Sequence, residues 1–144
     1  MEGDVKTGNF IEIIEFEDGT KYKKQYENFI LILESYFKNE ILHRDNDLPA
    51  QIKYFKDGKL ARLNWYKNGD KYESNTPSEI FYNLYGIIRQ QEWCYRNEST
   101  DHITMLRIQY YANGNIASEF KYDCNLQRMY DYILYDEFGN IKND

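Results

Sequence analysis

The stretch Ile52–Leu60 reads IKYFKDGKL, and it decides the fold because the chain repeats its pattern three more times. The pattern is I-x-Y-x-x-x-G-x-[LI], and it returns as IFYNLYGII at Ile80–Ile88, IQYYANGNI at Ile108–Ile116 and ILYDEFGNI at Ile133–Ile141. Successive repeat glycines are 28, 28 and 25 residues apart, at Gly58, Gly86, Gly114 and Gly139. Internal repetition at such a period indicates an array of small supersecondary units.

Each repeat is predicted to be a β-hairpin, because glycine between two alternating runs is a strong turn signal. Two loops fit the first repeat. A two-residue loop, Asp57-Gly58, pairs Phe55 with Leu60, whereas a three-residue loop ending on a left-handed glycine pairs Tyr54 with Leu60. We prefer the three-residue loop, because it places the Ile, the Tyr and the final Leu or Ile of every repeat on one face.

The composition also favours an all-β chain. The 144 residues include 15 Tyr and 8 Phe but only 2 Pro, and aromatic residues suit strands. We predict an elongated, twisted antiparallel sheet built from repeated hairpins, forming one domain over residues 1–144. Within it we expect a flexible N-terminus at residues 1–9, a degenerate first unit at residues 10–47 and hairpin repeats at residues 48–144.

The N-terminal segment leaves two alternatives open. IEIIEFEDGTKYKK at Ile11–Lys24 predicts a hairpin that turns at Asp18-Gly19. For residues 24–42, strand and helix compete. Tyr26–Ala50 aligns with the next repeat, which predicts strands, but the apolar residues between Tyr26 and Phe37 also fit a helical spacing. We favour strands, and a helix is the alternative.

Catalytic chemistry has little support in the sequence. The two histidines, His43 and His102, have no cysteine or second histidine at the spacing of metal ligands. Cys94 and Cys124 have no histidine close in sequence, and no phosphate-binding glycine loop is present. We therefore expect a protein that is not an enzyme, with no cofactor and no metal site.

A partner-binding surface is better supported. If the strands continue regularly past each turn, aromatic and cationic side chains gather on the face opposite the repeat Ile and Tyr. Such residues dominate the energetics of protein interfaces. The alternative is that another layer of the fold covers this face. The candidate partner-binding residues are Phe55, Lys59, Arg62, Trp65, Phe81, Arg89, Trp93 and Tyr111.

Charge suggests which partner would bind. The chain has a net charge of −6, and residues 51–96, with 8 bases and 5 acids, form a block of +3 between acidic flanks. The basic and aromatic residues of that block allow nucleic-acid binding as an alternative. The overall acidity favours instead a protein partner with a basic surface, such as a nuclease or a toxin. The sequence contains no apolar run long enough for a membrane span and no signal peptide, so we expect a cytoplasmic protein.

The phrases YFKDGKL, WYKNGD, YYANGNI and YDEFGNI resemble MORN-variant repeats, which are hairpin repeats with a Y-x-x-N-G-K-[LI] core. The resemblance covers residues 40–144 and, more weakly, residues 10–39. It implies an all-β, non-catalytic interaction module with an antitoxin or immunity role in bacteria. In a phage or virus it implies an inhibitor of a host nuclease or defence complex. The chain lacks the second glycine and the Y-x-G-x-W phrase of the common MORN pattern, so phospholipid binding is not carried over.

Overall fold

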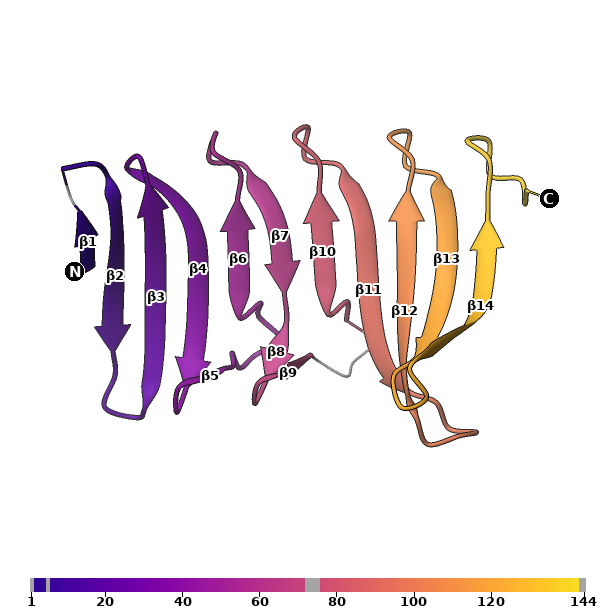
Figure 1. Ribbon diagram of the computed structural model, residues 1–144, viewed down its shortest axis with the longest axis horizontal. Helices are drawn as coiled ribbons and strands as arrows, with labels where there is room; N and C mark the ends of the chain where they lie inside the picture. Colours follow the sequence, from indigo (N-terminus) through magenta and orange to yellow (C-terminus); the bar gives the residue numbers. More distant parts are fainter. Residues whose placement is uncertain (1, 5, 72–75, 143–144) are drawn as a thin grey trace. The chain divides into compact units, whose positions relative to one another are not determined.

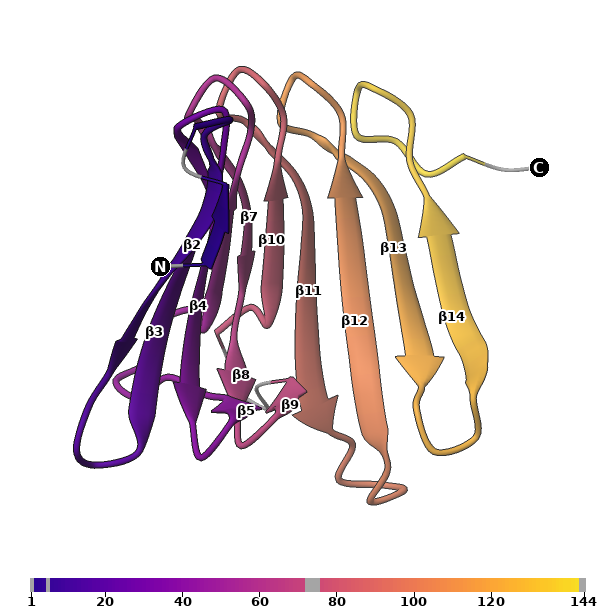
Figure 2. The same ribbon diagram turned by 60° about the vertical axis from the view of Figure 1, so that its left-hand side comes forward.

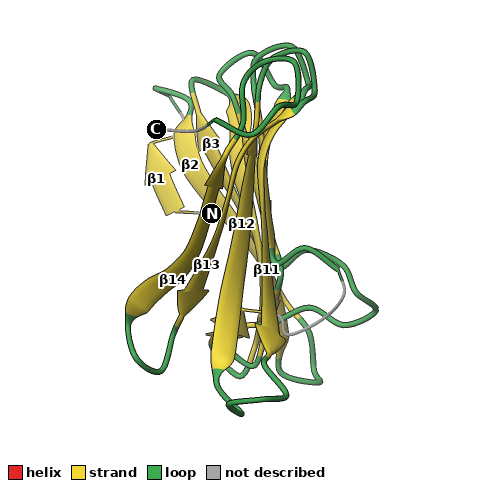
Figure 3. Ribbon diagram, turned by 90° about the vertical axis from the view of Figure 1, so that its right-hand side faces the viewer, coloured by secondary structure: helices red, strands yellow, loops and turns green. Residues whose placement is uncertain are grey.

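The computed structural model describes residues 2–4, 6–71 and 76–142, and in these residues the chain consists of strands and loops without a helix (Figure 3). The predicted all-β class, with antiparallel strands joined as hairpins, is confirmed. The chain divides into two compact units, Met1–Lys71 and Tyr72–Asp144. We call them the N-terminal unit and the C-terminal unit and describe each by itself. The expectation of one domain stays a prediction.

The N-terminal unit contains one antiparallel sheet and one small hairpin (Figure 1). Its strands are β1 (Glu2–Asp4), β2 (Asn9–Glu15), β3 (Thr20–Glu27), β4 (Ile30–Lys38), β5 (Ile41–Leu42), β6 (Gln51–Tyr54), β7 (Leu60–Asn64), β8 (Tyr66–Lys67) and β9 (Asp70–Lys71). The sheet order is β1-β2-β3-β4-β6-β7, with β5 paired to β4, while β8 and β9 form the separate hairpin. Residues 2–4, within the segment expected to be flexible, form β1.

The strand interpretation of residues 24–42 is correct, and the helical alternative is wrong. β3 and β4 pair over their whole lengths, and they are joined at Asn28 and Phe29, which have φ of 49° and 64°. Two consecutive left-handed residues make a tight hairpin turn. The turn contains no glycine, so the sequence gives only a weak signal for it. The hairpin predicted at Asp18-Gly19 is also present, between β2 and β3.

The C-terminal unit is a simple antiparallel meander of five strands. They are β10 (Glu79–Tyr82), β11 (Ile88–Arg96), β12 (Ile103–Tyr110), β13 (Ile116–Asp123) and β14 (Arg128–Leu134). The repeat turns after β10, β12 and β14 lie at the same end of these strands (Figure 2). Among the described residues of this unit, these five strands form one layer that no helix covers. Residues 72–75 and 143–144 of the predicted repeat region lie outside the described residues.

The predicted register is confirmed in all four repeats. Tyr54 lies opposite Leu60, Tyr82 opposite Ile88, Tyr110 opposite Ile116 and Tyr135 opposite Ile141. In the first repeat the Phe55 amide donates to the Lys59 carbonyl at 2.8 Å, which closes the three-residue loop. Gly58 ends that loop with φ of 87°, a conformation that costs residues with a Cβ atom about 1 kcal/mol or more.

A second bulge follows each of the first three repeat turns, and it overturns the predicted arrangement of the faces. Tyr54 lies opposite Leu60, but Lys53 lies opposite Arg62, so that Ala61 is an extra residue. Arg89 and Ala117 are the extra residues at the same place in the next two hairpins. One extra residue moves every later side chain to the other face.

The correction concerns residues beyond the bulge. Leu63 lies opposite Ile52 and Gln91 lies opposite Ile80, so both belong to the face that carries the repeat Ile and Tyr. Trp93, two residues after Gln91 on β11, shares that face and lies opposite Leu106. The expectation that Trp93 faces away from Ile80 is therefore wrong.

Little apolar surface is fully buried in this open sheet. Among the residues that the structure describes, the buried apolar residues are Ala50, Trp65 and Cys94, and most other apolar side chains are half-buried. Hydrogen bonds from tyrosine hydroxyls to neighbouring strands add to the stability that this small apolar core provides. The hydroxyls of Tyr22 and Tyr54 both donate to Glu34, Tyr110 donates to Gln91 at 2.7 Å, and Tyr135 donates to Glu119 at 2.9 Å. Three of the repeat tyrosines, Tyr54, Tyr110 and Tyr135, thus join their strands to a neighbour through a side-chain hydrogen bond.

Replacing Gly114 by alanine should lower the free energy of unfolding by about 1 to 2 kcal/mol, because alanine resists a left-handed backbone. A Cβ atom at Gly114 would meet nothing within 4 Å, so the cost arises from φ, which is 89°. Gly114→Asn should cost less, because asparagine tolerates this conformation better. Urea unfolding measures both variants. Equal midpoints for wild type and Gly114→Ala would show that the turn does not depend on a left-handed glycine.

Stability should decline above pH 10. Burial, followed by the bond to Glu34, raises the pKa of Tyr22 and of Tyr54 above the ordinary value of 10.0. A raised folded-state pKa stabilises the fold below the unfolded-state pKa, and this contribution is lost as the pH rises through the folded-state pKa. Tyr54→Phe should lower stability at pH 7 by about 1 kcal/mol and make the alkaline decline shallower.

Urea unfolding between pH 7 and pH 11.5 tests this expectation. Tyr85→Phe is the matched control, because the Tyr85 side chain is 87% exposed. Parallel pH profiles for wild type and Tyr54→Phe would exclude a role for the bonds to Glu34.

Candidate functional site

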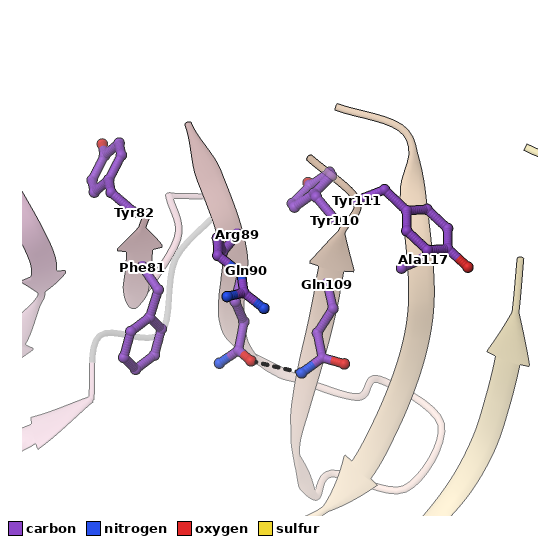
Figure 4. Close-up of a pocket in the computed structure, with 8 residues that line it drawn as sticks. All are labelled: Phe81, Tyr82, Arg89, Gln90, Gln109, Tyr110, Tyr111 and Ala117. Atoms are coloured by element: carbon purple, nitrogen blue, oxygen red, sulfur yellow. Dashed lines mark hydrogen bonds between the residues drawn. The ribbon is translucent and has the colours of Figure 1, made fainter. Parts of the chain in front are cut away.

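A hollow in the C-terminal unit lies toward the repeat-turn ends of its strands (Figure 4). It has a volume of about 480 Å³, within the usual range for ligand sites. We call it the Arg89 groove. Its lining comes from β10 to β13 and the β12–β13 turn, and consists of Phe81, Tyr82, Arg89, Gln90, Gln109, Tyr110, Tyr111 and Ala117.

The second bulge brings Arg89 into the groove. Phe81 lies opposite Gln90 while Tyr82 lies opposite Ile88, so Arg89 has no residue opposite it on β10. A bulge redirects the side chain of the extra residue. In Figure 4 the Arg89 and Gln90 side chains lie together, between Phe81 on one side and Gln109 on the other. Arg89 is exposed, and it is the only charged residue in the lining.

Hydrogen bonds hold the two tyrosines at the end of β12 in place, one on each face of the strand. The Tyr111 hydroxyl donates to the Tyr135 carbonyl at 2.6 Å, and the Tyr110 hydroxyl donates to Gln91 Oε1 at 2.7 Å. Burial, and to a smaller degree Glu119, raises the pKa of Tyr110, so its hydroxyl remains a donor at neutral pH. Rings that are already ordered lose little entropy when a ligand binds.

A chain of polar side chains forms the floor. Ser118 Oγ donates to Gln109 Oε1 at 2.9 Å, Gln109 Nε2 donates to Gln90 Oε1 at 3.0 Å, and Gln90 Nε2 donates to Glu92 Oε2 at 3.3 Å. The chain ends on a buried ion pair, in which Arg107 Nη2 lies 2.7 Å from Glu92 Oε2. The floor is therefore neutral where it meets the groove, and its single carboxylate is paired.

A second hollow adjoins the Arg89 groove. It has a volume of about 260 Å³, and it shares Arg89, Tyr110 and Tyr111 with the groove. These three residues therefore stand between two depressions. A ligand longer than one side chain can contact both depressions while remaining close to the Arg89 guanidinium.

The structure brings three of the eight predicted partner-binding residues together. Phe81, Arg89 and Tyr111 all line the groove. Trp93 belongs to the same unit but lies further along β11, on the face of Ile80. The other four residues, Phe55, Lys59, Arg62 and Trp65, belong to the N-terminal unit.

The four residues of the N-terminal unit have different environments. Phe55 closes the first repeat turn by donating to Lys59, and Arg62 is half-buried opposite Lys53. Trp65 is only 7% exposed, and its Nε1 donates to the Asp47 carbonyl at 2.9 Å. Of the two alternatives for this face, Trp65 fits the covered one, and this residue holds the loop around Asp47 in place.

Sequence analysis missed five groove residues, namely Tyr82, Gln90, Gln109, Tyr110 and Ala117. Tyr82 and Tyr110 were assigned to the scaffold by their place in the repeat, and the glutamines depend on the second bulge. One signal was available. Ala61, Arg89 and Ala117 are 28 residues apart, so Arg89 stands out at a position where two repeats have alanine.

The two histidines form local pairs away from the groove. His43 Nε2 lies 2.7 Å from Asp45 Oδ1, and His102 Nδ1 lies 2.8 Å from Asp123 Oδ2. The bond from His102 lowers the pKa of Asp123. Among the described residues, no group of three or more His, Cys, Asp or Glu is arranged to hold a metal ion. In the same residues no helix is long and apolar enough to cross a membrane.

Comparison with known proteins finds no relative of this chain. No protein-family model, no curated protein sequence and no solved structure matches the chain. The resemblance to MORN-variant repeats stays a prediction.

Proposed function

We propose that this chain is a non-catalytic module that binds a partner protein through the Arg89 groove and inhibits it, as an antitoxin or immunity protein does. The groove itself is the observation that carries the proposal. It places the rings of Phe81 and Tyr111 beside one arginine, while Tyr82 and Tyr110 also contribute to its lining. Tyrosine and arginine are enriched among the residues that contribute most to interface affinity.

Charge supports a partner with a basic surface. Residues 72–144 contain 11 acids and 6 bases, so the C-terminal unit has a net charge of −5. Such a field speeds encounter with a basic protein and depends on ionic strength. Nucleases and many toxins present basic surfaces to their substrates, and a phage or viral inhibitor of a host nuclease or defence complex would fit this description.

The groove gives little support to nucleic-acid binding. A nucleic-acid-binding protein normally neutralises each phosphate that it contacts with a lysine or an arginine, and the groove lining offers Arg89 alone. Of the eight bases in residues 51–96, six belong to the N-terminal unit and two, Arg89 and Arg96, to the C-terminal unit. Arg96 already lies 3.3 Å from Asp101. Nucleic-acid binding by other parts of the surface stays a prediction.

Filling the groove should abolish partner binding without unfolding the protein. Ala117→Leu places a larger side chain in the lining, whereas Ala61→Leu makes the same change at the equivalent bulge of the N-terminal unit. Immobilised wild type and Ala61→Leu are expected to retain a common protein from the native host extract that Ala117→Leu does not retain. The purified partner should then lose activity when wild type is added. Equal retention by both variants, or full partner activity in the complex, would refute the proposal.

A further inference from the structure

Arg89 occupies a backbone position that two other hairpins fill with alanine. Ala61, Arg89 and Ala117 are each the extra residue of the bulge that follows a repeat turn. Because alanine suffices at two of these positions, the hairpin does not require a long cationic side chain at the third. The folding of the repeat therefore does not explain the Arg89 guanidinium.

The guanidinium also has no anionic partner within residues 2–4, 6–71 and 76–142. The ion pairs of the C-terminal unit use Arg96, His102 and Arg107 instead. The neighbouring Gln90 and Gln109 bond each other, and Tyr110 and Tyr111 donate their hydroxyls elsewhere. Arg89 thus remains as an exposed donor among groups whose own hydrogen bonds are already satisfied.

We propose that the Arg89 groove docks an extended segment of the partner protein that carries one carboxylate side chain between apolar neighbours. This inference rests on the proposed function and names the chemistry that the groove selects. The complement of a lone guanidinium is an anion, and its planar fork fits a carboxylate with two parallel hydrogen bonds. Phe81 and Tyr111 lie on opposite sides of Arg89 in Figure 4 and offer ring surface to the apolar neighbours.

The surrounding charge selects a single anionic group. The C-terminal unit is acidic, so a segment with several anionic groups would be repelled outside the groove. Arg89 is also the only charged residue of the groove lining, so the lining offers no second cation for a second anion. A single carboxylate within an otherwise basic segment satisfies both conditions, because the basic residues meet the acidic unit and the carboxylate meets Arg89.

Peptide titration of the full-length protein followed by two-dimensional NMR tests the proposal. The probe is acetyl-Lys-Phe-Glu-Phe-Lys-amide, and its counterpart replaces Glu by Gln. Wild type should bind the Glu peptide about fivefold more tightly than the Gln peptide, as expected for one exposed charge pair. The NMR signals of Arg89 and Tyr111 should shift during the titration. Arg89→Ala should bind both peptides equally. Arg128→Ala, which removes an exposed arginine outside the groove, should keep the wild-type preference.

A charge exchange provides the decisive arm. Arg89→Glu should prefer acetyl-Lys-Phe-Lys-Phe-Lys-amide to the Glu peptide, which reverses the wild-type order. Equal binding of the Glu and Gln peptides by wild type would overturn the proposal, and so would a preference that survives in Arg89→Ala. Tighter binding of a short oligothymidylate in the same groove would also overturn it.

The outcomes separate this inference from the proposed function. If Ala117→Leu retains the partner as well as Ala61→Leu does, the groove is not the interface and the proposed function fails. If Ala117→Leu loses the partner but the peptides show no carboxylate preference, the proposed function holds and the inference fails.

Discussion

A left-handed glycine at each repeat turn is the constraint on which the rest of the fold depends. It fixes a three-residue loop, and the loop fixes the residue that faces each repeat tyrosine. From that pair the alternation of a strand assigns every neighbouring side chain to a face. Few residues of this fold are fully buried. The local register of each hairpin, rather than burial in a large core, therefore determines which side chains lie on which face.

The bulge that follows the first three repeat turns changes which side chains this scaffold presents. It displaces one residue out of the regular alternation, and in the C-terminal unit that residue is Arg89. The equivalent bulge in the hairpin of β12 and β13 has Ala117 as its extra residue, and this small side chain lines the same groove as Arg89. Two equivalent bulge positions with residues of very different size thus contribute to the lining of the groove.

The comparison of sequence with structure shows which features are locally encoded. The hairpins, their register and the Asp18-Gly19 turn follow from glycine and from residue alternation, and the sequence predicts them. The turn at Asn28-Phe29 contains no glycine, and its left-handed residues are set by the pairing of β3 with β4. The second bulge has no residue signature, because Ala61, Arg89 and Ala117 share no chemical property. This explains why Phe81, Arg89 and Tyr111 were predicted as site residues while Trp93 was assigned to the wrong face and Gln90 and Gln109 were missed.

The recurring bulge position also separates the identity of an exposed side chain from the backbone geometry of its hairpin. Backbone geometry at residues 61, 89 and 117 is set by the adjacent turn, so the side chain there can vary from methyl to guanidinium within one chain. The side chain at such a bulge position can change while the backbone of the hairpin stays the same. Different side chains at successive bulge positions would give related chains different partner preferences.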